Sequence, residues 1–268
     1  MHQINKISRT LKATERMPIL FIGHGSPMNA IEDNVFSRKW VGLGGQIPKP
    51  QAILCISAHW LTSGTQVTAM EKPRTIHDFG GFPEELFRQQ YPAPGSPEMA
   101  GAIAKMSTEY PVSQNQDWGL DHGTWSVLKP MFPLADIPVL QLSIDYSKPP
   151  EYHFELARQL SKLREKGVLV LGSGNIVHNL RQLRFDESIP DWSVEFDTQI
   201  AGWIESGDDR SIVGFQELGS LAKMAHPTYD HFLPLLYVLG MKYKTDRPEF
   251  FNTGFQMGSI SMRSVIWQ

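Results

Sequence analysis

Short apolar runs, each as long as a buried strand, constrain the fold of this chain more than any other feature of its sequence. They occupy residues 17–22, 52–57, 65–70, 137–144 and 168–171. Runs of about four to eight apolar residues that stop at turn-forming residues are typical of strands with both faces buried. Residues 257–267 alternate between apolar and polar side chains, which predicts a further strand near the C-terminal end.

Helical patterns lie between these runs. The first begins with Ser96, a good N-cap residue, and Pro97, which suits the first position of a helix, and it extends to residue 106. Further helices are expected at residues 149–166, 194–204 and 232–239. Strands that alternate with helices indicate an α/β fold, in which helices flank a central, mixed and largely parallel sheet.

Length and composition indicate one domain in this chain of 268 residues, which we place at residues 17–268 after a loosely ordered tail at residues 1–16. The net charge of −3, without long runs of Lys or Arg, argues against a nucleic-acid partner. No apolar stretch approaches the ~18 residues of a membrane-spanning helix. The single cysteine, Cys55, cannot form an internal disulfide, which favours a reducing, cytoplasmic compartment.

Histidines follow the predicted strands at the points where those strands end. His24 comes just after the first run, His59 just after the second, and the turn after the fifth run leads to His178. In open α/β sheets, ligands bind outside the carboxyl ends of the strands, and neutral imidazole is the commonest protein ligand of metals. The sequence therefore predicts a metal site that the fold assembles from distant segments, since no local motif such as HExxH is present.

A further candidate ligand, His231, lies where the helix at residues 232–239 should begin. The positive end of the helix dipole disfavours imidazolium there, and a metal needs the neutral ring. A solvated helix cap explains the residue equally well, and His226 competes with it in the same segment. No role is predicted for His2, in the tail, or for His153, on a helix face.

Two more histidines lie in segments that are predicted to be loops. His122 follows Asp121, a carboxylate that could orient the ring or simply pair with it. His77 lies in the segment at residues 76–83, which is rich in aromatic residues, Gly and Pro and shows weak periodicity. Long ordered loops are often functional, so this segment is interpreted as either a substrate lid or a surface loop.

Seven segments carry most of the His, Gly, Pro and aromatic residues discussed above. They are residues 23–28 (GHGSPM), 57–60 (SAHW), 76–83 (IHDFGGFP), 91–97 (YPAPGSP), 121–125 (DHGTW), 174–180 (GNIVHNL) and 230–236 (DHFLPLL). Together, and in this order, they resemble the class III extradiol ring-cleavage dioxygenases of the LigB type, in particular the 4,5-DOPA dioxygenase branch. The resemblance extends over almost the whole chain.

The resemblance implies a role for each of five histidines. His24 and His59 match the first two metal ligands, and His231 matches the third. His178 matches a residue that faces the metal, either as a fourth ligand or as the acid/base that handles substrate protons. His122 matches a histidine near the bound oxygen and substrate.

The resemblance also implies a catechol substrate such as DOPA, molecular oxygen as the second substrate, and Fe(II) as the catalytic metal. Within the matching segments we assign substrate binding to Ser26, His77, Asp78 and Phe79. Many related enzymes have a carboxylate as third ligand, which Asp230 could supply here. An all-histidine site also suits zinc, so isolated protein could carry Zn(II).

Two other functions remain open from the residues alone. A zinc site with an open position for water could activate that water, as in a hydrolase. The fold is also similar to that of non-enzymatic proteins that bind phosphopeptides at a metal site. The aromatic segment at residues 76–83 and the intact Asp-His-Gly sequence at residues 121–123 favour the dioxygenase.

Overall fold

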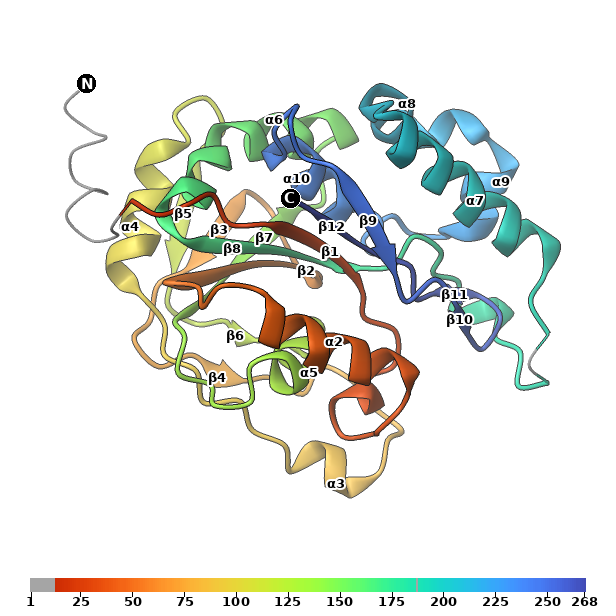
Figure 1. Ribbon diagram of the computed structural model, residues 1–268, viewed down its shortest axis with the longest axis horizontal. Coiled ribbons are helices and arrows are strands. Elements are labelled where there is room, and N and C mark those ends of the chain that lie inside the picture. The colour runs from red at the N-terminus through yellow and green to blue at the C-terminus, as the bar shows by residue number, and fades with distance from the viewer. Residues whose placement is uncertain (1–12, 187) are drawn as a thin grey trace.

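A mixed eight-stranded sheet forms the centre of the fold in the computed structural model, which describes residues 13–186 and 188–268 (Figure 1). In order across the sheet, the strands are β5 (Val112–Asn115), β3 (Thr65–Thr68), β7 (Val139–Asp145), β2 (Ala52–Thr62), β8 (Val168–Gly174), β1 (Ile19–Gly23), β12 (Ser264–Trp267) and β9 (Pro248–Phe251). The four central strands, β7, β2, β8 and β1, are parallel, and β3, β12 and β9 each pair antiparallel with a neighbour. The predicted α/β fold with a mixed, largely parallel sheet is confirmed. Of the predicted tail, residues 1–12 lie outside the described residues.

Helices cover both faces of this sheet: α2 and α5 pack on one face, and α10, with α6 against it, packs on the other (Figure 1). The α-helices are α2 (Val35–Gln46), α3 (Glu84–Phe87), α4 (Pro97–Met106), α5 (His122–Met131), α6 (Pro150–Leu160), α7 (Asp191–Ser206), α8 (Asp209–Val213), α9 (Ser220–Ala225) and α10 (Leu233–Met241). The 3₁₀ helices are η1 (Pro27–Ala30), η2 (Ser161–Lys166), η3 (Leu180–Gln182) and η4 (Phe215–Leu218). Two small sheets pair β4 (Arg74–Thr75) with β6 (Gly119–Leu120) and β10 (Phe255–Gln256) with β11 (Ile260–Ser261). In the part of the chain that the structure describes, no helix is long and apolar enough to cross a membrane.

The central strands are buried on both faces, which explains why they appear in the sequence as uninterrupted apolar runs. Along β1, Ile19 and Phe21 belong to the core on the side of α6 and α10. The alternate residues Leu20 and Ile22 belong to the core on the side of α2 and α5. The sheet therefore separates two apolar cores, and its carboxyl edge is left free for polar side chains.

Strand β2 extends further than its apolar run predicts. It continues through His59 to Thr62, and its pairing with β7 shifts register between Ile56 and Leu61. Extra residues bend a strand and change the direction of its side chains. The irregular end of β2 therefore gives His59 a direction that a regular strand would not.

The other differences from the predicted elements have local causes. The strand predicted at residues 257–267 begins later, because Met257 and Gly258 have φ values of +48° and +69° and form a turn before β11. It is also divided into β11 and β12, with Met262 and Arg263 between them. Helices α2 and α5 were not predicted. Three glycines interrupt the pattern of α2, and α5 contains Gly123 and Pro130.

His153 lies on α6, as predicted, but its side chain is buried and its Nδ1 is 2.9 Å from the hydroxyl oxygen of Tyr237. Burial lowers the pKa of His153 from 6.5 to about 4. The folded protein therefore binds this proton more weakly than the unfolded chain, and the contribution of the neutral ring to stability is lost as the pH falls from 6.5 to 4. At pH 4.5 we expect a loss of about 2 kcal/mol through this residue.

Urea unfolding of the metal-free protein at pH 7 and pH 4.5 tests this expectation. The His153→Gln variant keeps a group that can hydrogen-bond to Tyr237 but cannot titrate. The loss of stability between the two pH values should be about 2 kcal/mol smaller in the variant than in the wild type. Equal losses in both proteins would contradict the assignment.

Candidate metal centre

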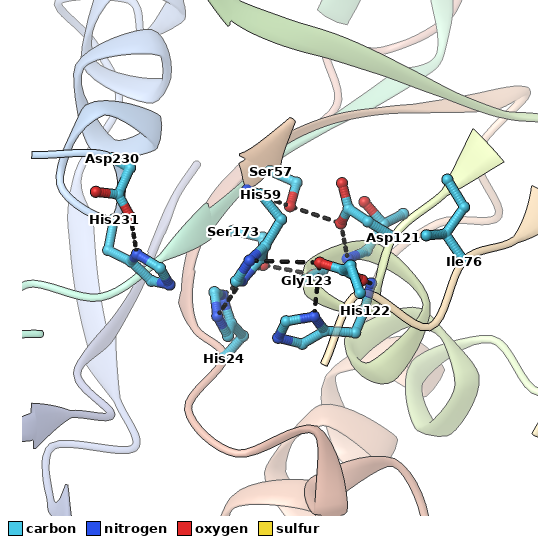
Figure 2. Close-up of polar contacts among 12 residues, drawn as sticks. His24, Ser57, His59, Ile76, Asp121, His122, Gly123, Ser173, Asp230 and His231 are labelled. Carbon is cyan, nitrogen blue, oxygen red and sulfur yellow. Dashed lines mark hydrogen bonds and ion pairs between the residues drawn. The ribbon is translucent and has the colours of Figure 1, made fainter. Parts of the chain in front are cut away.

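Three histidines meet at the carboxyl edge of the central sheet (Figure 2). His24 follows β1, His59 lies in the irregular end of β2, and His122 is the first residue of α5. One potential ligand nitrogen from each ring lies within 4.8 Å of those from the other two. These three rings form a cluster that could bind a metal ion, at the edge where the parallel strands place it.

Two further histidine rings adjoin this cluster. The ring centroid of His231, in the segment before α10, lies 5.3 Å from that of His24 and 4.9 Å from that of His59. The ring of His178 stacks on His231 with centroids 3.5 Å apart and planes inclined by 3°. The fold thus brings together five histidines from segments that are far apart in the sequence.

The hydrogen bonds of Ser173 determine which nitrogen of His24 carries the proton. The hydroxyl of Ser173 donates its single proton to the carbonyl oxygen of Gly123. It must therefore accept a hydrogen bond from Nδ1–H of His24, at 3.0 Å. Nε2 of His24 is left with a free lone pair, which is the state that a metal ligand requires.

His59 presents its own Nε2 to the same place. The Nε2 atoms of His24 and His59 are 3.2 Å apart, while Nδ1 of His59 lies 3.4 Å from a carboxylate oxygen of Asp78. Two lone pairs that face each other at this distance repel unless a proton or a cation lies between them. The arrangement is therefore suited to a shared cation.

His231 is held in a similar way. Its Nδ1–H donates to the carboxylate of Asp230, and its backbone carbonyl accepts a hydrogen bond from the N–H of Asn175, at 2.9 Å. Its Nε2 is buried without a hydrogen-bond partner. A buried polar atom left unpaired costs about 1–3 kcal/mol. A divalent cation facing the cluster would satisfy this nitrogen, so the donor set fits a metal.

The protonation of these rings also favours a metal. Burial, followed by the effect of neighbouring histidines, lowers the pKa of His24 and of His231 well below 6.5. Burial and the neighbouring His122 lower the pKa of His59 to about 3. All three rings are therefore neutral at pH 7, and a metal ion does not have to displace a proton from them.

The partner of His122 is Asp78, not the adjacent Asp121. Nδ1–H of His122 donates to Oδ2 of Asp78 at 2.9 Å, and its backbone N–H donates to Oδ1 at 2.8 Å. Asp121 is fully buried as the N-cap of α5 and accepts hydrogen bonds from Ser57 and Gln141. Burial raises the pKa of Asp121 to about 6. His122 is therefore not paired with Asp121, its neighbour in the sequence.

Among the residues assigned to the substrate, Asp78 contacts the cluster directly, and Phe79 packs against it with its ring centroid 5.5 Å from that of His122. His77 packs against Phe79 and Trp125 and has its Nε2 2.9 Å from the carbonyl oxygen of Gln89. The contacts of His77 are therefore with the aromatic segment and its neighbours, and not with the histidine cluster.

Ser26 and His226 have local partners as well. The hydroxyl of Ser26 caps η1 by accepting from the N–H of Met28, and its own N–H donates to Gln256 at 2.8 Å. The Nε2 of His226 is 2.6 Å from the carbonyl oxygen of Ile176, away from the ring contacts that join His231 to His24 and His59. Ser26 thus shapes the turn that follows His24, and Nε2 of His226 already has a hydrogen-bond partner.

The backbone of Gly123 lies close to the side chains of Ser57 and His59. A Cβ atom at this position would lie 2.5 Å from Oγ of Ser57 and 2.9 Å from Cδ2 of His59. We expect Gly123→Ala to destabilise the protein by about 1–3 kcal/mol and to weaken metal binding, because His59 must move. Thermal unfolding and Zn(II) titration measure the two effects.

Gly42→Ala is a matched control, since a Cβ atom there meets nothing within 4 Å and the residue lies in helix α2. This change should leave metal binding unaltered and stabilise the protein by about 0.5–1 kcal/mol. If Gly123→Ala bound Zn(II) as tightly as Gly42→Ala, the proposed packing of His59 would be wrong.

Comparisons with known proteins agree with a metal centre of this kind. Residues 20–264 match a family described as the catalytic LigB subunit of aromatic ring-opening dioxygenase. The chain is similar to the 4,5-DOPA dioxygenase extradiol of Escherichia coli K12, with 47% identity over 95% of this chain and 96% of that protein. It is also similar to the protein of the same name from Beta vulgaris, with 35% identity over 91% and 94%. A crystal structure of an uncharacterized Escherichia coli K12 protein matches with a TM-score of 0.82 and 42% identity, covering 94% of this chain and 99% of that one.

Proposed function

The chain belongs to the LigB family of aromatic ring-opening dioxygenases and is an extradiol dioxygenase, and we propose that it cleaves the ring of a catechol such as DOPA. The observation that carries the proposal is the convergence of three histidines: Nδ1 of His24 and of His231 are hydrogen-bonded to Ser173 and Asp230, and Nδ1 of His59 lies 3.4 Å from Asp78. Their Nε2 lone pairs are free to hold a metal between them. Family membership favours this function over a zinc hydrolase or a phosphopeptide-binding protein.

We infer that His24, His59 and His231 hold the metal, and that the catalytic ion is Fe(II). When bound, Fe(II) would supply a Lewis-acidic, redox-active centre at which catechol and O₂ can exchange electrons. The unpaired, buried Nε2 of His231 supports this residue as the third ligand in preference to His122. The same three neutral rings suit Zn(II), which could occupy the isolated protein.

His178 is proposed as the acid/base and not as a fourth ligand. The lone pairs of an imidazole lie in the plane of its ring. Because the rings of His178 and His231 are stacked in nearly parallel planes with centroids 3.5 Å apart, their lone pairs cannot meet at one metal ion. Burial lowers the pKa of His178 to about 4, so its neutral ring nitrogen can accept the proton of a catechol hydroxyl and later return it to an oxygen of the product.

His122 and Phe79 are proposed to form the opposite wall of the site. With the proton on Nδ1 donated to Asp78, His122 has its Nε2 free to accept a hydrogen bond from an O–H group of the bound reactants. Phe79, packed edge-on against His122, can contact the aromatic ring of the substrate. Ser26 and His77, which have local partners, contribute by shaping the adjoining loops.

The experiment that tests the function is an oxygen-uptake assay on protein stripped of metal and reloaded with Fe(II) without air. Addition of DOPA and then oxygen should consume O₂ and give a yellow, ring-opened product. Protein loaded with Zn(II) should do neither, because zinc has no redox chemistry. A panel of catechols with and without the amino-acid side chain tests the substrate class. Absence of oxygen uptake with every catechol would overturn the proposal.

A further inference from the structure

The aromatic segment at residues 76–83 lies beside α5 and the residues just before that helix. Hydrogen bonds hold it there. β4, just before the segment, pairs with β6, just before α5. The N–H of Ile76 donates to the carbonyl of Leu120 at 2.8 Å, and Nε1 of Trp125 donates to the carbonyl of Ile76 at 2.8 Å. The segment is thus a wall attached to α5 at several points, and not a free lid.

Asp78 extends this attachment into the histidine cluster. Its Oδ1 accepts the backbone N–H of His122, and its Oδ2 accepts Nδ1–H of the same residue. The same Oδ2 lies 3.4 Å from Nδ1 of His59. One carboxylate on the aromatic wall therefore contacts two histidines that come from different elements, β2 and α5.

The chemistry of a carboxylate makes these contacts directional. An ionised carboxylate only accepts hydrogen bonds, so Nδ1 of His122, which is hydrogen-bonded to Asp78, must carry its proton. For His59 the carboxylate lies 3.4 Å from Nδ1 and so helps to orient the ring, whose Nε2 faces His24 at 3.2 Å. For His122 the proton on Nδ1 leaves Nε2 as an acceptor on the side of the cluster.

We propose that Asp78 is a positioning residue that fixes the Nδ1–H tautomer of His122, orients the ring of His59 and so couples the aromatic wall to the metal centre. Phe79 follows Asp78 directly and packs edge-on against His122. A shift of Asp78 therefore moves the wall and the ring of His122 together. The metal-affinity part of the proposal rests on the proposed role of His59 as a ligand, whereas the tautomer part does not.

Other carboxylates near the cluster do not duplicate this function. Asp230 contacts His231, one residue away in the sequence. Asp121 uses its oxygens for Ser57, the N–H of Thr124 and Gln141. Asp78 thus contacts two elements of the site. A variant at this position can test the role of these contacts separately from the stability of the fold.

The test is Asp78→Asn, examined first in the metal-free protein by ¹⁵N NMR of the histidine rings. Asn can still accept from the backbone N–H of His122, but it presents an NH₂ group to Nδ1 of that ring. We expect His122 to change from the Nδ1–H to the Nε2–H tautomer. We expect Zn(II) affinity to fall by about 10–100-fold, as is typical when a partner that orients a ligand is removed.

Asp78→Glu serves as the conservative variant. It retains an acceptor-only carboxylate, so the tautomer of His122 should stay as in the wild type. Its longer side chain displaces the wall and Phe79. With Fe(II) and catechol, this variant should therefore show a raised KM with a smaller change in kcat, whereas Asp78→Asn should lower kcat as well.

Thr75→Val is the matched control for loosening the same segment. The hydroxyl of Thr75 accepts the N–H of Tyr91 at 2.9 Å and has no contact with the histidine rings. This variant should lose thermal stability but keep wild-type tautomers and Zn(II) affinity. If it reproduced the effects of Asp78→Asn, the role of Asp78 would be structural only and the proposal would be wrong.

Unchanged tautomers in both Asp78 variants would also overturn the proposal. Failure of the wild-type protein to bind Zn(II) would instead count against the proposed metal centre. In that case the NMR spectra of the metal-free protein would still decide whether Asp78 fixes the tautomer of His122. The two failures are therefore distinguishable.

Discussion

Replacing His231 with alanine should lower the affinity for Fe(II) and Zn(II) by roughly 10²-fold or more. Its Nδ1 is bound to Asp230 and its Nε2 is buried without a partner beside the cluster. If three nitrogens share about 10 kcal/mol of metal binding, each accounts for roughly 3 kcal/mol, or about 10²-fold in affinity. Metal analysis of the purified protein and competition with a chromophoric chelator measure the loss.

His226→Gln is the control for this substitution. His226 lies five positions earlier in the same segment, but its Nε2 is 2.6 Å from the carbonyl oxygen of Ile176. A glutamine amide can donate to that oxygen, so metal affinity should stay within a few-fold of the wild-type value. Loss of metal in this variant, with retention in His231→Ala, would mean that His226 is the ligand.

His122→Ala tests which of two possible sets of three histidines binds the metal. One set is His24, His59 and His122, whose ligand nitrogens lie within 4.8 Å of one another. The other replaces His122 with His231. Because Nδ1 of His122 is bound to Asp78, we expect His122→Ala to retain most of its metal and to lose activity. A greater loss of metal than in His231→Ala would favour the first set.

The location of the site was predictable from the sequence because it depends on a local feature, the apolar run that precedes each histidine. Apolar runs identify buried strands, and parallel strands bring their carboxyl ends to one edge of the sheet. His24 and His59 each follow such a run, so their meeting requires only that β1 and β2 both border β8, as the structure has them. The direction of His59 was not predictable, because it depends on the register shift in β2.

The partners of the histidines could not be predicted, since they depend on strand order and on packing between distant segments. Ser173 is 149 residues from His24, and Asp78 is 44 residues from His122. The sequence offered Asp121 as the nearest carboxylate to His122, but the N-terminus of α5 uses Asp121 as its cap. The pairing of β4 with β6 and the hydrogen bonds of Ile76 place the aromatic segment, and with it Asp78, beside that helix end.

Replacing His178 with phenylalanine should lower kcat by about 10²–10⁴-fold, which is the usual contribution of a general acid/base. Phenylalanine can retain the stacked contact with His231, whose ring lies 3.5 Å away by centroid, but it cannot accept or return a proton. Metal affinity should therefore remain within a few-fold of the wild-type value, and KM should change much less than kcat. Steady-state oxygen uptake and metal titration of the same preparation give both quantities.

The metal content of His178→Phe distinguishes the two roles that the resemblance implies for His178, metal ligand and acid/base. A ligand would be lost with its nitrogen, so His178→Phe would release metal together with activity. An acid/base acts only on the substrate, so the variant would stay loaded but slow. Because the ring planes of His178 and His231 are inclined by only 3°, the in-plane lone pairs of the two rings do not point to a common position. Retention of metal with loss of turnover is therefore the result that the stacked geometry requires.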